Sequence, residues 1–318
     1  MKFATLIDQD RQQQLWIVSR DLQRCIKATD IVCTLQDALN DWQYCFTDLQ
    51  KRYERLNNNE IHGDEFKQER CHAPLPFPKQ LKEYASHRNH SLDMQNELRS
   101  LSQYTLAPTV IDNQFLTPHT SFDLTTFESN ADCAADVVVV TSDVPKGISA
   151  HEAEHYIRLV MLANDLSFHS PANNDSDLSA YFYDMTASRS FSPVAVTVDE
   201  LSPYWESANV HLPLYSFFNG HSIKQTAAQC ERNVSYAHLL AAAAKNHVLK
   251  AGTIVGSGLL SNLYLASIFH HQNYSSSRIA HGLRSRWKEE LCIGDVFKVE
   301  MYTPDGQSIF GSINHTIV

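Results

Sequence analysis

The spacing of hydrophobic residues changes early in the chain. Residues 1–20 alternate between apolar and polar side chains, with a polar stretch near residues 9–13, which predicts a β-hairpin. From Thr34 to Leu56 the large apolar residues recur every three or four positions, the spacing of an amphipathic helix. The chain therefore opens with a small β unit that a helix closes.

A change in composition marks the end of this unit. Residues 57–70 are polar and nearly free of large apolar side chains, and Pro74, Pro76 and Pro78 then favour an extended backbone. We place a domain boundary near residue 72. This divides the chain into a small N-terminal α/β unit, residues 1–72, and a larger domain, residues 73–318.

The larger domain begins its regular pattern with a buried strand. Asp136 to Thr141 contains four consecutive valines, which indicates a strand buried on both faces. Ser149 and Glu152 form a capping-box pattern at the start of a helix. The apolar stripe of that predicted helix is Ala153, Ile157, Val160 and Met161.

Further strands and one further helix follow. The alanine-rich residues 231–247 predict the helix, and the pattern of strands separated by turn residues predicts an α+β domain in which strands predominate. The expected strands are residues 194–198, 211–218, 253–257, 296–302 and 308–313.

Composition removes several classes of function. The 318 residues carry 26 Lys and Arg against 36 Asp and Glu, a net charge of −10 without a basic run, which makes nucleic acid an unexpected partner. No segment reaches the roughly 20 apolar residues of a membrane span, and residues 1–20 lack the apolar core of a signal peptide. Seven dispersed cysteines suggest neither a disulfide framework nor a thiolate zinc site. We expect a cytoplasmic protein.

One short motif suggests zinc chemistry. His151-Glu152-Ala153-Glu154-His155 matches H-E-x-x-H, in which two histidines one helical turn apart bind zinc and the Glu acts as base. The metzincin continuation of the motif fails, because Arg158 stands where glycine is required. The alternative is the first turn of a helix, with acidic residues favoured by the helix dipole and solvated histidines. A zinc hydrolase using His151 and His155 is kept as a minor alternative.

Several segments, taken in chain order, resemble the fumarylacetoacetate hydrolase family, in particular its long bacterial members. The similarity covers roughly residues 73–318. The segments include Asn89-His90, the run Thr141-Ser142-Asp143-Val144-Pro145, Asn164-Asp165 and Phe191-Ser192-Pro193-Val194-Ala195-Val196-Thr197. They also include residues 73–76, 132–140, 157–163, 251–258, 293–295 and 306–311.

The resemblance implies a mixed β-sheet roll with a small N-terminal domain, and a homodimer. It also implies a reaction, the hydrolysis of a carbon–carbon bond in a small 1,3-dicarbonyl acid such as fumarylacetoacetate or an acylpyruvate, as in aromatic amino acid catabolism. A Mg²⁺ or Ca²⁺ ion held by carboxylates binds the dicarbonyl oxygens, and a histidine activates the attacking water. The expected partner is a small dicarboxylic or diketo acid.

Carried onto this chain, the family pattern assigns site residues. The metal ligands are Asp136, from E-x-E, and Asp165, from Asn-Asp. His90 is the candidate base. Arg189 is close enough in sequence to replace a catalytic lysine whose own position is Thr186. The substrate-binding candidates are His169, Ser257 and Gly258.

The chain also departs from the pattern. The first Glu of E-x-E is Ala134, which offers no oxygen ligand, and the second is shortened to Asp136. His169 stands where the family commonly has arginine, and Leu259 follows Gly258 where a threonine is expected. Asp132, two residues before Ala134, is one possible replacement ligand, although strand geometry places it roughly 6 to 7 Å away.

These departures leave alternatives open. One is a family hydrolase with a weakened metal site. Another is a catalytically inactive member, a pseudoenzyme that binds a small ligand or a protein partner. At the level of single residues, Asp136 and Asp165 are either metal ligands or salt-bridged and capping carboxylates, and His90 is either a base or a structural histidine.

Overall fold

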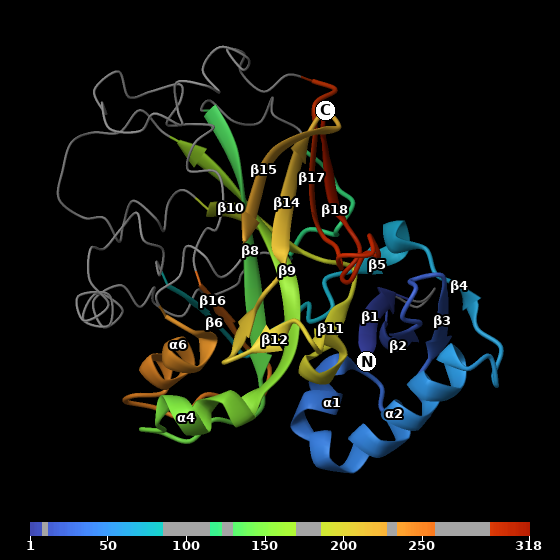
Figure 1. Ribbon diagram of the computed structural model, residues 1–318, viewed down its shortest axis with the longest axis vertical. Helices are drawn as coiled ribbons and strands as arrows, with labels where there is room; N and C mark the ends of the chain where they lie inside the picture. Colours follow the sequence, from blue (N-terminus) through green and yellow to red (C-terminus); the bar gives the residue numbers. More distant parts are fainter. Residues whose placement is uncertain (8–11, 85–114, 123–129, 170–185, 228–233, 258–292) are drawn as a thin grey trace.

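The computed structural model describes residues 1–7, 12–84, 115–122, 130–169, 186–227, 234–257 and 293–318, which form an α+β fold with more strand than helix (Figure 1). The helices are α1 (Leu35–Asn40), α2 (Trp42–Asn57), α4 (Ala150–Ala153) and α6 (Tyr236–Ala243), with 3₁₀ turns at Gln68–Arg70, Glu154–Tyr156 and Val198–Leu201. The α+β class predicted from the sequence is confirmed.

Within the described residues, eleven strands form one sheet. Its order is β4-β3-β2-β1-β11-β9-β8-β16-β6, with β10 on β9 and β5 on β1. The strands are β1 (Lys2–Ile7), β2 (Gln13–Val18), β3 (Arg24–Lys27), β4 (Asp64–Glu65), β5 (Cys71–His72), β6 (Gln80–Glu83), β8 (Asn130–Thr141), β9 (Ile157–His169), β10 (Thr186–Phe191), β11 (Ala195–Thr197) and β16 (Thr253–Gly256).

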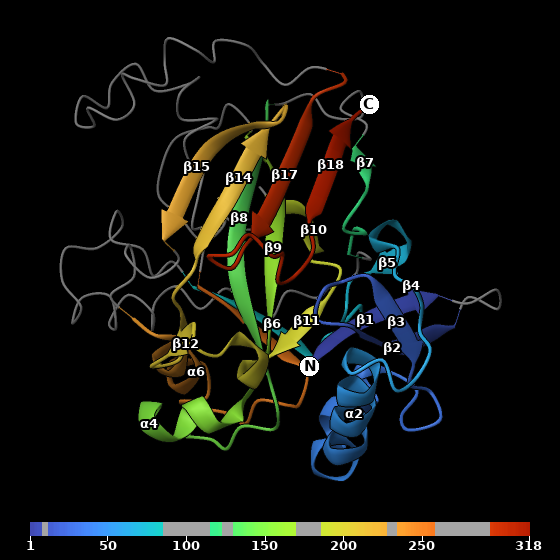
Figure 2. The same ribbon diagram turned by 45° about the vertical axis from the view of Figure 1, so that its right-hand side comes forward.

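A second sheet of five described strands packs against the first, with the order β15-β14-β17-β18-β7. Its strands are β7 (Ser121–Phe122), β14 (Pro213–Phe218), β15 (His221–Ala227), β17 (Val296–Met301) and β18 (Ile313–Ile317). Figure 2 shows these strands side by side in front of β8 and β9. A short separate hairpin joins β12 (Trp205–Glu206) to β13 (Asn209–Val210).

The two faces of the main sheet belong to different cores. On one face, Val137, Val139 and Leu162 pack with the inner side of the second sheet and with α6. On the other face, Val138 and Met161 pack with α1, α2 and the N-terminal strands. Successive residues of a strand point to opposite faces, so the continuous valine run of β8 supplies both cores at once. A residue's place in this alternation therefore decides which layer it meets.

The N-terminal unit has the predicted elements. Strands β1 and β2 form an antiparallel hairpin in which Lys2 is paired with Val18. The predicted helix over 34–56 is present as α1 and α2, separated at Asp41. Thr34 caps α1 by accepting a hydrogen bond from the Asp37 backbone N–H. No helix of the described part of the chain is long and apolar enough to cross a membrane.

This unit is continuous with the rest of the protein, because β1 pairs with β11 and extends the main sheet. An ion pair joins the two parts as well. Arg20 Nε donates to Glu200 Oε1 at 2.7 Å. Burial raises the pKa of Glu200, but its hydrogen bonds, first that from Arg20, outweigh this effect and hold the pKa below its usual value. The division at residue 72 stays a prediction.

One predicted helix is wrong beyond its first turn. The capping box of Ser149 and Glu152 is present, but α4 ends at Ala153, and Ile157–His169 is strand β9. Leu159 to Ala163 form an unbroken apolar run, and Ile157 to Ala163 are buried, except Arg158, on both faces of the sheet. A continuous apolar run of this kind favours a buried strand over an amphipathic helix.

The last predicted strand is displaced along the chain. Of the expected range 308–313, Ser308 makes an isolated β-bridge with Tyr302, and Ile313 is the first residue of strand β18. Gly311 has a φ of 73°, in the left-handed region that interrupts extended backbone. A side chain at this position would also meet Pro193. The predicted strands over 194–198, 211–218, 253–257 and 296–302 correspond to β11, β14, β16 and β17.

A buried histidine connects the two sheets. His315, on β18, is fully buried, and its Nδ1 lies 3.2 Å from the Thr120 carbonyl oxygen. A carbonyl can only accept, so Nδ1 carries the proton and Nε2 accepts the hydrogen bond from Ser190 Oγ on β10, 2.7 Å away. Burial lowers the pKa of His315 to about 4.

We predict that this histidine makes stability depend on pH. In the unfolded chain it takes a proton near pH 6.5, whereas in the folded protein it does so only near pH 4. The free energy of unfolding should therefore fall as the pH drops from 6.5 to 4, by about 3 kcal/mol from this group. Urea denaturation at several pH values measures the effect, and His315→Gln should remove it.

The matched control is His151→Gln, which removes an exposed histidine. Its pH profile of stability, measured in parallel, shows what the loss of an exposed histidine does by itself. Parallel profiles for the wild type and His315→Gln would contradict the assignment.

Candidate functional site

Three adjacent strands carry a row of residues that includes Asp165, one of the two predicted metal ligands. In the pairing of β8 with β9, Ala134 stands opposite Asp165. In the pairing of β9 with β10, Asp165 stands opposite Arg189. The row therefore runs Ala134, Asp165, Arg189 across the sheet. Asp165 has the same phase in β9 as Met161 and Ala163, so it lies on the face opposite to the second sheet.

Asp165 and Arg189 form a bidentate ion pair. Arg189 Nε donates to Asp165 Oδ1 and Arg189 Nη2 donates to Asp165 Oδ2. Asp165 is 5% exposed and Arg189 8%. Two parallel N–H···O bonds between a guanidinium and a carboxylate give a strong, directional contact, and both oxygens of Asp165 take part in it. The salt bridge, one of the two interpretations of Asp165 made from the sequence, is present, and its role as a metal ligand stays a prediction.

Asp136 lies two residues further along β8 than Ala134, and it is 1% exposed. It accepts hydrogen bonds from the Ser257 backbone N–H to Oδ2 at 3.1 Å, from Ser257 Oγ to Oδ1 at 2.7 Å, and from the Val137 backbone N–H to Oδ1 at 2.7 Å. Ser257 follows β16, which pairs with β8. Asp136 therefore ties the end of β16 to β8.

These residues do not fit a divalent cation. A hard cation such as Mg²⁺ needs carboxylate, carbonyl or water oxygens around it. Here both oxygens of Asp165 accept from the guanidinium of Arg189, and Ala134 supplies no oxygen. Among the described residues, no group of three or more His, Cys, Asp or Glu side chains is placed to hold a metal ion.

The remaining predicted site residues are placed only in part. Ser257 is buried and contacts Asp136. His169 ends β9, four residues from Asp165 and roughly 13 Å along the strand. His90 and Gly258 lie outside the described residues. The roles predicted for all of them stay predictions.

The H-E-x-x-H segment has a structural role at its first glutamate, Glu152. Glu152 accepts hydrogen bonds from the backbone N–H and Oγ of Ser149, as a helix cap. His151 and His155 are exposed, and their ring centroids are 6.3 Å apart. In the part of the chain that the structure describes, no third ligand accompanies them.

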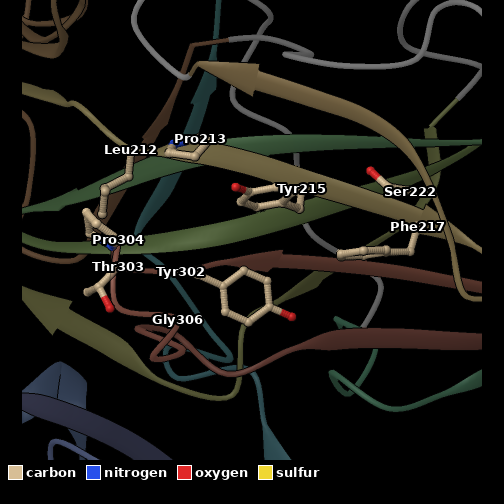
Figure 3. Close-up of a pocket in the computed structure, with 9 residues that line it drawn as sticks. All are labelled: Leu212, Pro213, Tyr215, Phe217, Ser222, Tyr302, Thr303, Pro304 and Gly306. Carbon is tan, nitrogen blue, oxygen red and sulfur yellow. The ribbon is translucent and has the colours of Figure 1, made fainter.

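A hollow of about 550 Å³ lies elsewhere, on the outer side of the second sheet. Figure 3 shows Tyr215 and Phe217, on β14, and Tyr302 around it. The neighbours of these residues in β14, Leu214 and Ser216, are buried toward the first sheet. Since Asp165 lies on the opposite face of that first sheet, both sheets separate the hollow from the Asp165–Arg189 pair.

Two family models together match nearly the whole chain. "Fumarylacetoacetase N-terminal domain 2" matches residues 1–77, and "Fumarylacetoacetate (FAA) hydrolase C-terminal" matches residues 83–318. The chain therefore belongs to the fumarylacetoacetate hydrolase family, as the sequence resemblance predicted. No curated protein matches the chain by sequence.

Solved structures share the fold over the full length. Maleylpyruvate hydrolase from Sphingobium sp. SYK-6 is 11% identical, with a TM-score of 0.62, and covers 100% of this chain and 99% of its own. Fumarylacetoacetate hydrolase from Exiguobacterium antarcticum is 13% identical, with a TM-score of 0.57 and coverage of 100% and 99%. A 5-carboxymethyl-2-hydroxymuconate delta-isomerase from Mycobacterium smegmatis is 12% identical, with a TM-score of 0.55 and coverage of 100% and 98%. At these identities the similarity establishes the fold.

Sequence reasoning missed two contacts. The Arg189–Asp165 pair depends on the register of β10, which shifts at an irregularity between Thr186 and Ser188, and no local pattern reveals that shift. The Ser190–His315 contact had a signal. His315 alternates with Ile313 and Ile317, so it occupies a core-facing position of its strand.

We predict that Asp165 and Arg189 are energetically coupled. Asp165→Leu leaves a buried guanidinium without its carboxylate, and Arg189→Met leaves a buried carboxylate without its cation. Each single change should lower the free energy of unfolding by about 3–5 kcal/mol. The double variant should lose less than either single variant, because apolar replacement of a whole buried pair is often nearly neutral.

Urea denaturation of the four proteins completes this double-mutant cycle. The exposed pair Lys51 and Asp48, on α2, is the control, since pairs of this kind contribute little. Strictly additive losses for Asp165→Leu and Arg189→Met would refute the coupling.

Proposed function

We propose that this protein is a member of the fumarylacetoacetate hydrolase family that has lost metal-assisted hydrolysis and acts as a binding protein for a small acid. The observation that carries this proposal is the Asp165–Arg189 pair in register with Ala134. The chain keeps the scaffold of the family and changes the groups that would hold the metal. This proposal corresponds to the catalytically inactive family member that the sequence left open as an alternative.

The charge of the site supports the loss of metal-assisted hydrolysis. The family pattern would place three carboxylates at positions 134, 136 and 165, which together attract a divalent cation. At the same three positions this chain has two carboxylates, a net formal charge of −2 in place of −3, and the guanidinium of Arg189 lies on Asp165. A metal ion at Asp165 would have to displace the guanidinium of Arg189. The two positive charges would then repel each other in a buried site, where water screens them little.

The expected ligand is a small dicarboxylic or diketo acid. The support is the family itself and one of its structures, since maleylpyruvate hydrolase from Sphingobium sp. SYK-6 has been solved in complex with manganese(II) and pyruvate. That structure is 11% identical to this chain, with a TM-score of 0.59. We further propose a cytoplasmic homodimer, which sedimentation analysis tests.

The second candidate function is a weakened hydrolase of the acylpyruvate or fumarylacetoacetate type, with Mg²⁺ or Ca²⁺ and His90 as base. The retention of Asp136 and Asp165 favours it, because both positions keep a carboxylate. Under this candidate, the protein would serve aromatic catabolism. Arg189 would then have to leave Asp165 when the metal binds.

We predict no metal-dependent turnover by the wild-type protein. Acetylpyruvate and fumarylacetoacetate, each assayed with Mg²⁺, Ca²⁺ and Mn²⁺, should be hydrolysed at the rate of a protein-free blank with the same metal. Calorimetric titration with pyruvate and oxalate in the absence of metal should detect binding. The physical reason for the first result is that the guanidinium of Arg189 engages both oxygens of Asp165 and that Ala134 supplies no oxygen.

Asp165→Ala is the control that separates the two candidates. Turnover that exceeds the blank and disappears in Asp165→Ala would reject the proposal and establish the hydrolase. Absence of both turnover and acid binding would reject the small-acid ligand while leaving the loss of hydrolysis in place.

A further inference from the structure

We infer that the guanidinium of Arg189 is a fixed cation that stands in for a divalent metal ion at Asp165, and that two substitutions are enough to restore metal binding. This inference rests on the loss of metal-assisted hydrolysis proposed above. Its test measures metal affinity alone, without any substrate, so that it can fail separately from the acid-binding proposal.

The first observation is the register of three strands. Ala134 and Arg189 are the two cross-strand neighbours of Asp165, one on each side. Side chains directly opposite each other in antiparallel strands have Cβ atoms about 4.5–5.5 Å apart. A carboxylate at position 134 would therefore start next to Asp165, on the same face of the sheet. Ala134, which lacks an oxygen ligand, and Arg189, which carries the positive charge, are thus both neighbours of the Asp165 carboxylate.

The second observation is burial. A carboxylate that is 5% exposed is costly without a compensating positive charge. Arg189 supplies that charge through two donors, and it is itself buried at 8% exposure. Arg189 therefore gives Asp165 the compensating positive charge that a bound metal ion would otherwise supply. The substitution of one cation for another keeps the carboxylate buried and the strands in register.

The third observation concerns the carboxylate beside the row. Asp136 lies on the same strand as position 134 and two residues away, which places both residues on the same face. Ser257 and the Val137 backbone hold Asp136 in place by hydrogen bonds. A glutamate at position 134 would supply the carboxylate that the row lacks, next to Asp165 and two residues from Asp136. Removal of the guanidinium would release both oxygens of Asp165 for a cation.

The test is the double variant Ala134→Glu/Arg189→Ser, titrated with Mn²⁺ by calorimetry and by the decrease of the free Mn²⁺ signal in electron paramagnetic resonance. We expect Mn²⁺ affinity at least about 100-fold higher than that of the wild type, since the loss of single ligating or supporting groups changes metal affinity on the order of 10–100-fold. Mn²⁺ should also raise the melting temperature of the double variant only, because a ligand stabilises the fold that binds it.

Ala134→Gln/Arg189→Ser is the matched control, with nearly the same side-chain volume and no added charge. Its Mn²⁺ affinity should stay at least about 10-fold below that of the glutamate variant. Adding Asp165→Asn to the glutamate variant should abolish the gain. The single variant Arg189→Ser provides a second test if the double variant does not fold, and it should bind Mn²⁺ about 10-fold more tightly than the wild type.

Two results would overturn the inference. One is wild-type affinity for Mn²⁺ equal to that of the folded double variant. The other is a folded Arg189→Ser protein, alone or with Ala134→Glu, that binds Mn²⁺ no better than the wild type.

Discussion

The antiparallel pairing of β8 with β9 is the constraint on which the other features of this molecule depend. These two strands are the longest of the described chain, and their register decides which residues share a face and a row. One face receives the second sheet, and the other receives the N-terminal helices. A slip of one residue would exchange the two faces. It would turn Asp165 toward the second sheet and bring Asn164 to the side of Arg189.

That register also places the carboxylate of Asp165 in a buried position, so the charge of the site affects the stability of the fold. A buried carboxylate in the middle of a sheet must be compensated, and the sheet accepts either a bound ion or a side chain of its own for that purpose. In this protein the compensation comes from the next strand, at Arg189. The charge of Asp165 is therefore balanced within the polypeptide.

Much of the fold could be predicted from local patterns, and the site only in part. The hairpin, the helix over 34–56 and the valine strand follow from period and composition, which act locally. The helix predicted beyond Ala153 was wrong because the spacing of Ile157 and Val160 fits a helical stripe as well as a strand. The unbroken apolar run Leu159 to Ala163 is the pattern that favours the strand. The candidate residues Asp136, Asp165 and Arg189 were found through the family resemblance. Their contacts could not be found, because pairing across strands depends on residues far apart in the chain and on an irregularity in β10.

The pairing of β1 with β11 has a consequence for how this protein can be dissected. The N-terminal strands complete the main sheet, so their removal would leave β11 at an open edge. The unpaired backbone N–H and C=O groups of that edge could then pair with a strand of another molecule. It would also strip α1 and α2 from the apolar face formed by Val138, Val140 and Met161. Residues 73–318 alone would thus contain an incomplete main sheet and would tend to self-associate. A shortened form of the protein needs another strand to pair with β11.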